Sequence, residues 1–382
     1  GLMRTVFEEL ARRLRRTDLL LLRAVRRQRA RPSMRAKGQF WGSVITDDEV
    51  DALLRAHGEI DWPDTQDALA DAVVASAALR DEAEGRVSRL RHAFELDGDD
   101  IDLLLLAVAP EISNGYARIF AYLNDNLNQA YLTVDLATRI LRTHRTERLA
   151  LQGRLMSNAP LIKSRLLLLF PHEGAETLAS RRVHPSGRML RWLLEEEELP
   201  SGVGFAPMDT SREPFIPGPT RQRIQEITHA LDRPVTIAVV GSTLGSREGA
   251  AMAIARAAGR PLARVDLERA QQYIDQPWDL LRELRLSRAL PYVVNVVASQ
   301  EDPAQRAGIV RLGSALATLP YPVLIGGSDR RAIGSLLGAE RPSLTVMVGR
   351  TTMDERVAAW KDAFQQRGWN PEIASEVSER FY

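Results

Sequence analysis

The sequence predicts a mainly α N-terminal region followed by an α/β domain built on a parallel sheet. In the first half, apolar residues recur at the spacing of an amphipathic helix, as Val6, Leu10 and Leu14 do. A stretch rich in proline and glycine, 200–219, ends this pattern. Beyond it, short runs of β-branched residues alternate with helical segments, which is typical of parallel strands joined by crossover helices.

Local signals place the helices of the first half. The first helix runs from Met3 to about Ala30. A second begins after Thr46, whose side chain can cap it while Glu49 returns a hydrogen bond to the cap. Gly, Asn or Pro residues separate the further helices that we expect, at 68–91, 100–109, 115–124 and 133–143.

A small hairpin is expected after these helices. The apolar run Arg165–Phe170 stops at a proline, and the polar loop 172–176 leads to a second extended segment, Arg181–His184. Helices followed by a short hairpin indicate a winged helix. We therefore predict a winged-helix-like domain at 96–199, with an acidic wing, after an N-terminal helical region at 1–95.

The second half is expected to contain one sheet domain and the start of a helical lid. Its parts are a linker at 200–219, an α/β domain at 220–350 and a partial helical lid at 351–382. The lid holds two helices, at 354–367 and 371–381. The strands of the domain are expected at 235–240, 262–265, 292–297, 322–325 and 345–348, with helices at 247–258, 277–288 and 303–316.

Composition excludes several classes of protein. The 382 residues carry 51 basic and 50 acidic side chains, so no overall field favours nucleic acid or an anionic membrane. The chain has no cysteine, which excludes disulfides and thiolate metal sites. The apolar run Leu19–Leu22 is far shorter than the roughly 20 residues of a membrane span. We expect a cytoplasmic protein that does not associate with membranes.

The turn after the first predicted strand is the candidate site. Strand 235–240 runs into a glycine-containing turn and then an alanine-rich helix, the setting in which a P-loop binds phosphate through backbone N–H groups. The simpler interpretation is a strand-to-helix turn that uses glycine for its backbone freedom. The candidate phosphate-binding residues are Gly241, Ser242, Thr243, Gly245, Ser246, Arg247 and Glu248.

Three of the four key positions depart from the Walker A motif G-x-x-x-x-G-K-[ST]. Gly241 holds the first glycine, but Ser246 replaces the second. Arg247 replaces the lysine, and its broad fork does not reproduce a compact ammonium. Glu248 replaces the hydroxyl that binds Mg²⁺ and adds a negative charge near the phosphates. From this degenerate motif we expect weak binding of ATP or ADP at most, no bound metal and no hydrolysis.

The other catalytic positions of a P-loop ATPase are also replaced. The acidic pair that holds the metal and polarises water is expected at Val297 and Ala298, which are both apolar. Ser328 occupies the position of a water-positioning asparagine. Three arginines could serve a neighbouring subunit as arginine fingers; these are Arg330, Arg331 and Arg341. Ordinary surface arginines are the commoner explanation.

Several phrases resemble one family, the AAA+ ATPases. The sequence segments that resemble an AAA+ core and the start of its helical lid are Val240-Gly241, Gly259–Asp266, Val323–Asp329 and Asp354–Trp360. Others resemble the winged-helix N-terminal region of bacterial AAA+ ATPases encoded with phage-tail-like contractile injection systems; these are Asp102–Glu111, Tyr116–Asn124 and Leu132–Arg139. The resemblance implies a degenerate first ATPase module, with the hydrolysing second module either beyond Tyr382 or missing.

The resemblance also implies a role in assembling or remodelling a protein complex such as a contractile injection system. It implies a protein partner bound through the N-terminal region, and a homo-oligomer or ring. The alternative is a winged-helix regulator that binds nucleic acid, although nucleic acid is not the partner that we expect. A solvated helix face is the commoner explanation for the arginines that could contact such partners: Arg12, Arg13, Arg15, Arg16, Arg23, Arg26, Arg27, Arg29 and Arg31.

Overall fold

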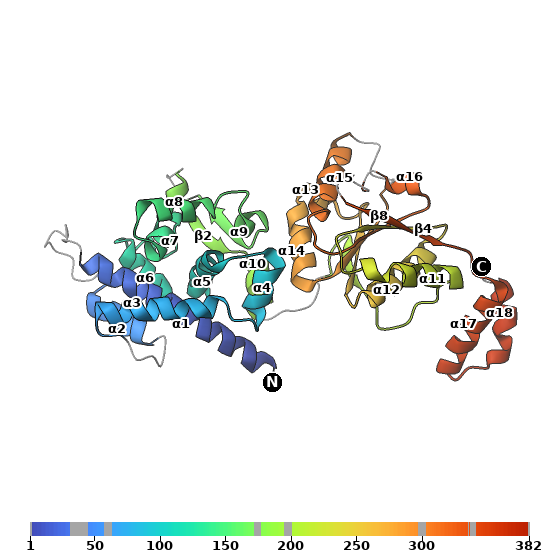
Figure 1. The fold of residues 1–382 in the computed structure, drawn as a ribbon, viewed down its shortest axis with the longest axis horizontal. Helices are drawn as coiled ribbons and strands as arrows, with labels where there is room; N and C mark the ends of the chain where they lie inside the picture. Colours follow the sequence, from blue (N-terminus) through green and yellow to red (C-terminus); the bar gives the residue numbers. More distant parts are fainter. Residues whose placement is uncertain are drawn as a thin grey trace. The chain divides into compact units, whose positions relative to one another are not determined.

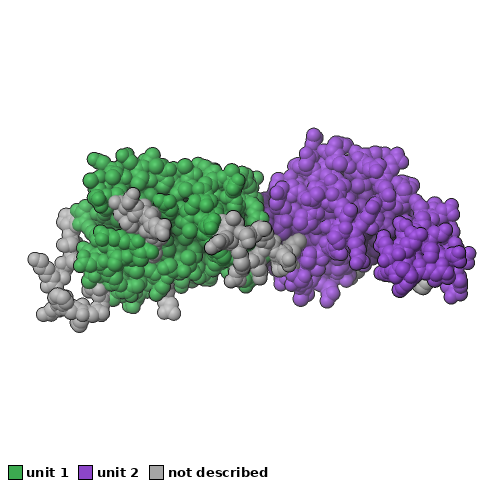
Figure 2. All heavy atoms as spheres, turned by 90° about the horizontal axis from the view of Figure 1, so that it is seen from below, with its two compact units in different colours: residues 1–197 green, residues 198–382 purple. Residues whose placement is uncertain are grey.

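The computed structural model describes residues 2–30, 45–56, 63–171, 177–194, 201–296, 303–334, 336 and 341–380. The chain divides into two compact units, Gly1–Glu197 and Glu198–Tyr382 (Figure 2). The expected wing loop 172–176 and the expected acidic-pair positions, Val297 and Ala298, lie outside the described residues.

Unit 1 is built around its first helix, α1 (Leu2–Arg29), drawn in blue in Figure 1. Four consecutive residues, Leu19 to Leu22, are all buried, so apolar contacts surround this part of the helix. A helix that is apolar on every side belongs inside a core. The elements that pack against α1 are α3 (Gln66–Ala75), η1 (Ser76–Arg80), α5 (Gly98–Ile112), α6 (Asn114–Leu123) and α7 (Val134–Leu141).

Two arginines of α1 lie inside unit 1. Arg16 donates hydrogen bonds to both carboxylate oxygens of Asp102, at 2.8 and 2.9 Å. Arg13 donates to Glu9 at 2.8 Å and to the carbonyl of Leu79 at 2.7 Å. The expectation of a solvated face is therefore wrong for Arg13 and Arg16. Their charges are tolerated in the core because acids and carbonyls of unit 1 compensate them.

The helix expected at 68–91 is divided in two. α3 continues into η1, and a separate helix, α4 (Arg86–Phe94), begins after Gly85. Gly85 has a φ of +96°, and a Cβ there would lie 1.9 Å from Oε2 of Glu9. The same carboxylate accepts a hydrogen bond from the Arg86 N–H at 2.7 Å. The close approach of Glu9 therefore requires glycine at this break, which helical periodicity alone does not reveal.

A short antiparallel hairpin follows these helices, as expected. β1 (Leu167–Phe170) pairs with β2 (Arg182–Pro185). Thr133, just before α7, forms an isolated bridge to Arg182, so the chain adds a third extended segment beside the hairpin. The remaining elements of unit 1 are α2 (Asp47–Ala56), α8 (Arg145–Gly153), α9 (Pro160–Lys163), η2 (Leu178–Ser180) and α10 (Gly187–Leu194).

Unit 2 contains a six-stranded sheet in the order β3-β5-β6-β7-β4-β8 (Figure 1). The predicted parallel sheet is present, with one antiparallel edge pair, β3 and β5. Its central strands are continuous apolar runs because helices cover both faces. The strands are β3 (Phe205–Met208), β4 (Thr236–Gly241), β5 (Leu262–Asp266), β6 (Leu290–Val294), β7 (Val323–Gly327) and β8 (Ser343–Val348).

Helices lie on both faces of this sheet. Figure 1 shows α11 (Gly218–Glu226) and α12 (Leu244–Ala257) on one face, and α15 (Pro303–Leu316) and α16 (Arg330–Ile333) on the other. The other helices of the unit are η3 (Thr228–Ala230), α13 (Gln271–Asp275), α14 (Pro277–Ser287), α17 (Met353–Gln366), η5 (Pro371–Ile373) and α18 (Ala374–Arg380). α13 and α14 pack with α15, whereas α17, η5 and α18 pack on one another near the C-terminus.

The segment expected to be a linker, 200–219, contains regular structure. β3 and the start of α11 lie within it. Gly204, with a φ of +77°, approaches Ala270 so closely that a Cβ would lie 2.6 Å from its backbone nitrogen. Pro207 suits an edge strand because it has no N–H to donate to the sheet. Gly204 and Pro207, which argue against a strand in the sequence, are thus compatible with the edge position of β3.

The opposite edge of the sheet is held by side chains of α11. Thr220 Oγ1 donates to the carbonyl of Met347 at 3.2 Å, and Arg223 Nε donates to the carbonyl of Thr345 at 3.3 Å. Both carbonyls belong to β8. These bonds fix α11 beside the edge strand.

Candidate functional site

The turn after β4 is shorter than a phosphate loop. β4 ends at Gly241, and only Ser242 and Thr243 precede α12. Thr243 caps this helix, because its Oγ1 accepts a hydrogen bond from the Ser246 N–H at 3.3 Å. Gly245 and Ser246, which the motif would keep in the loop, lie in the first turn of α12. The helix therefore begins earlier than expected, at the first residue after the Thr243 cap.

The Arg247 side chain folds back onto the end of β4. Its Nη1 donates to the carbonyl of Gly241 at 2.6 Å. A Cβ on Gly241 would lie 3.3 Å from Cγ of Arg247 and 3.0 Å from Cβ of Val348, so glycine leaves the room that the arginine uses. The half-buried guanidinium is thus bonded to the chain's own backbone, in the position where the motif's lysine would reach a phosphate.

Glu248 forms an ion pair within unit 2. Its carboxylate lies 3.2 Å from Nε of Arg264 on β5, and Nη2 of Arg264 lies 3.2 Å from Asp266. Asn295, just after β6, donates from Nδ2 to Asp266 at 2.8 Å. The charge of Glu248 is therefore compensated inside the protein, and it repels a phosphate less than an isolated carboxylate would.

A buried tyrosine lies close to this network. Tyr292 on β6 is fully buried, and burial raises its pKa to about 12, an effect that the positive charge of Arg247 opposes. A Cβ on Gly326 of β7 would lie 2.5 Å from the Tyr292 hydroxyl oxygen, so glycine is required beside the ring. Ser328, which follows β7, is exposed.

Arg341 is a structural arginine. Its Nη2 donates to the carbonyl of Tyr321 at 2.7 Å and its Nη1 to the carbonyl of Leu316 at 3.1 Å, and burial lowers its pKa. Neither interpretation of Arg341, as an arginine finger or as a surface residue, is therefore correct. Arg330 begins α16 and is exposed, whereas the side chain of Arg331 lies outside the described residues.

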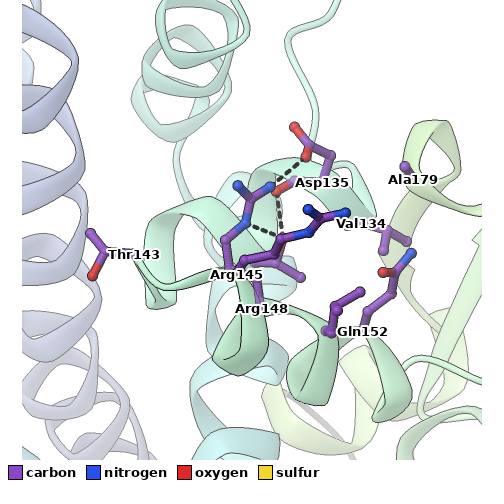
Figure 3. A pocket seen from close by; sticks show the side chains of 9 residues that line it. Val134, Asp135, Thr143, Arg145, Arg148, Gln152 and Ala179 are labelled. Carbon is purple, nitrogen blue, oxygen red and sulfur yellow. Dashed lines mark hydrogen bonds and ion pairs between the residues drawn. The ribbon is translucent and has the colours of Figure 1, made fainter. Parts of the chain in front are cut away.

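Unit 1 contains a pocket of about 360 Å³ between α7, α8 and η2 (Figure 3). Arg148 donates from Nη2 to Asp135 at 2.8 Å and from Nε to Thr138 at 3.4 Å. Arg145, Leu149 and Gln152 of α8 also line the pocket. Hydrogen-bond donors, one carboxylate and apolar groups thus converge on one concave surface, as in a ligand pocket.

Two searches within the described ranges gave negative results. No group of three or more His, Asp or Glu side chains there could hold a metal ion. No helix in the described part of the chain is long and apolar enough to span a membrane.

Comparison with protein families identifies the first half of the chain. A model of the family described as "Winged helix domain, variant" matches residues 5–204, which are 200 of the 382 residues. The chain belongs to this winged helix family. The winged helix match includes the hairpin of β1 and β2, and it also includes α1 to α4, which we expected to form a separate region. Searches of curated proteins and of solved structures gave no match.

The pocket of the winged helix domain was not among the predicted sites. Arg145, Arg148, Leu149 and Gln152 have the spacing i, i+3, i+4 and i+7, which places them on one face of α8. A helix at Arg145–Gly153 is not among the elements predicted from the sequence, so this spacing did not indicate a site. The spacing is the signal that could have located the pocket.

Proposed function

We propose that the chain joins a protein-binding winged helix domain to an AAA+-like module that does not hydrolyse ATP. In this proposal it acts in assembling or remodelling a protein complex such as a contractile injection system. The observation that carries the proposal is the place of β4, which lies between β7 and β8, the fourth and fifth parallel strands in chain order. An AAA+ core has the same strand order, with its phosphate-binding strand in this position.

The sheet topology also supports this proposal. After β4 the chain crosses to β5 on one side, whereas after β7 it crosses to β8 on the other side of β4. In open α/β sheets, ligands bind outside the carboxyl ends of the strands where the connections diverge in this way. The candidate residues 241–248 follow the carboxyl end of β4.

The side chains at this place do not fit a magnesium-bound nucleotide. Arg247 is bonded to Gly241, and Glu248, which pairs with Arg264, stands where the motif has a hydroxyl for magnesium. We therefore expect the module to act through its shape and its contacts, with ATP or ADP bound weakly at most.

Mg²⁺-dependent ATPase activity is expected to be absent, with a turnover below about 1 per minute. The reason is that Arg247 and Glu248 replace the lysine and the hydroxyl of the motif and are bonded elsewhere. Phosphate release from saturating ATP by the full chain measures this. A faster turnover that the Arg247→Ala substitution abolishes would contradict the proposal.

Restoring the motif is expected to restore nucleotide binding. The double substitution Arg247→Lys with Glu248→Thr returns an ammonium and a hydroxyl and releases the Gly241 carbonyl. We expect it to bind ADP at least about tenfold more tightly than the unaltered chain, a difference of about 1.4 kcal/mol, still without hydrolysis. Calorimetric titration measures both affinities.

The matched control for this titration is Arg233→Lys with Glu268→Thr, which changes the same residue types at exposed positions of unit 2. It should leave ADP binding unchanged. If the Arg247 and Glu248 variant folds normally and gains no affinity, the short turn itself prevents binding. The nucleotide part of the proposal then fails.

The alternative function is nucleic-acid binding by the winged helix domain. Such a surface needs cations that are free to meet phosphates. Arg148 in α8 pairs with Asp135, and Arg154, just after α8, pairs with Asp97. α8 also exposes Glu147. Of the two arginines of α8, only Arg145 lies outside an ion pair among the described residues, which favours a protein partner over a nucleic acid.

A further inference from the structure

The pocket of unit 1 has a charged side and an apolar side. In Figure 3, Arg145 and Arg148 lie beside Asp135, whereas Val134 and Ala179 lie toward η2. The pocket is formed by two consecutive helices, α7 and α8, and by η2, which lies later in the chain, directly before β2. The pocket is therefore a product of the fold and not of one helix surface.

The single acid of this pocket is already bonded to two arginines. Asp135 accepts from Arg148 at 2.8 Å through one oxygen and from Arg139 at 2.7 Å through the other. Arg145 is exposed, and no ion pair within the described ranges includes it. Glu147, the acid of α8, does not line the pocket. The lining of the pocket thus holds two arginines, Arg145 and Arg148, and one carboxylate, which leaves an excess of positive charge.

A second cavity, of about 40 Å³, extends this positive region. It shares Thr143 and Arg148 with the pocket, and its lining adds Arg27 and Arg142. Burial and nearby cations, chiefly Arg27, lower the pKa of Arg23 to about 10. Burial is the larger cause and Arg23 lines neither cavity, so the preference for an anionic ligand rests on the arginines that line the two cavities.

The apolar side of the pocket sets a second requirement for the ligand. Leu149 is 60% exposed, an unusual exposure for a leucine that lines a pocket. Together with the partly exposed Ala179 it offers a surface for an apolar group beside the arginines, whereas Val134 lines the pocket but is fully buried. The ligand that fits both sides carries a carboxylate next to an apolar side chain.

We propose that this pocket binds a carboxylate side chain in an acidic segment of the protein partner, with Arg145 donating to the carboxylate and Leu149 packing against a neighbouring apolar side chain. The proposal rests on the protein-binding role of the winged helix domain given above. An arginine fork can donate two parallel hydrogen bonds to a carboxylate. Duplex DNA would instead present a row of phosphates, which a concave pocket with an apolar side and its own carboxylate does not match.

The test uses the dipeptide N-acetyl-Glu-Leu-amide and the full chain. Methyl NMR follows Leu149 and Val134 as the dipeptide is added to about 20 mM, and we expect saturable shifts with a Kd of about 1 mM. Arg145→Ala should weaken binding about tenfold, because it removes a charge-assisted hydrogen bond. Arg15→Ala, which removes an exposed arginine of α1, should change the Kd less than twofold.

Several outcomes would overturn this inference. They are the absence of saturable shifts at Leu149, equal binding of the N-acetyl-Gln-Leu-amide analogue, and equal losses in the Arg145→Ala and Arg15→Ala variants. Shifts at Leu149 with a short DNA duplex but not with the dipeptide would assign the surface to nucleic acid instead. ATP hydrolysis by the chain would contradict the proposed module in unit 2 and leave these measurements in unit 1 unchanged.

Discussion

Asp102→Ala is expected to lower the free energy of unfolding of unit 1 by about 3–5 kcal/mol. Arg16 and Asp102 are only 5% and 2% exposed, so the substitution leaves a buried guanidinium without its carboxylate. Arg80, whose Nη1 lies 3.4 Å from Asp102, loses the same partner. Hydrogen exchange of peptides from α1 and α5 across a urea series measures the loss within unit 1.

The control for this loss is Asp71→Ala, which changes an exposed acid of α3. It should alter the same free energy by no more than about 0.5 kcal/mol. Replacing both partners with apolar residues, Arg16→Met with Asp102→Leu, should cost less than Asp102→Ala alone, because it leaves no unpaired charge. Equal costs for Asp102→Ala and Asp71→Ala would show that the buried pair does not stabilise the domain.

Tyr292→Ala is expected to lower the free energy of unfolding of unit 2 by about 3–5 kcal/mol. The ring is fully buried on β6, and its hydroxyl oxygen lies against Gly326 of the neighbouring strand. Removing it leaves a cavity in the middle of a sheet that helices cover on both faces. Hydrogen exchange of peptides from β6 and β7 in urea measures the change.

Tyr292→Phe is the matched comparison, since it keeps the ring and removes only the hydroxyl. It should cost about 1 kcal/mol or less. If the Phe and Ala variants lost equal stability, the hydroxyl and its surroundings, and not the packed ring, would hold this part of the sheet together. The interpretation of Tyr292 as a packing residue would then be wrong.

The sequence predicts elements well where one run of residues is buried continuously. The five predicted parallel strands are present with ends shifted by up to three residues. Such strands can be recognised from their own residues, because burial on both faces of a sheet requires uninterrupted apolar residues. The helix expected at 303–316 also coincides with α15, although it is only partly buried. The hairpin was predictable for another reason, because a proline and a polar loop end its first apolar run.

Elements that depend on distant contacts could not be predicted in this way. The break at Gly85 exists because the carboxylate of Glu9 occupies the space of a side chain there. β3 contains a proline that only an edge position tolerates, and its partner strand, β5, lies more than fifty residues away. Local propensity does not include such distant contacts, so it predicted a continuous helix through Gly85 and a linker in place of β3.

For the candidate turn, too, the position could be predicted from the sequence but the side-chain contacts could not. Its place after a buried strand and before a helix was predicted from the sequence, but its chemistry depends on where two side chains turn. Arg247 reaches back to Gly241, and Glu248 reaches Arg264 on β5. Aligning the sequence on the motif shows which groups are missing. Only the structure shows which hydrogen bonds and ion pairs the replacing residues make.

The two edges of the unit 2 sheet limit how this unit could associate with other chains. A bare edge strand is a template on which a strand from another molecule can add. On β8, two carbonyls are occupied by Thr220 and Arg223, and β3 is short and contains Pro207, which has no N–H to offer. Edge-to-edge growth of the sheet is therefore disfavoured at both ends. Copies of this unit that associate would therefore meet through side-chain surfaces, whose geometry decides whether the assembly closes.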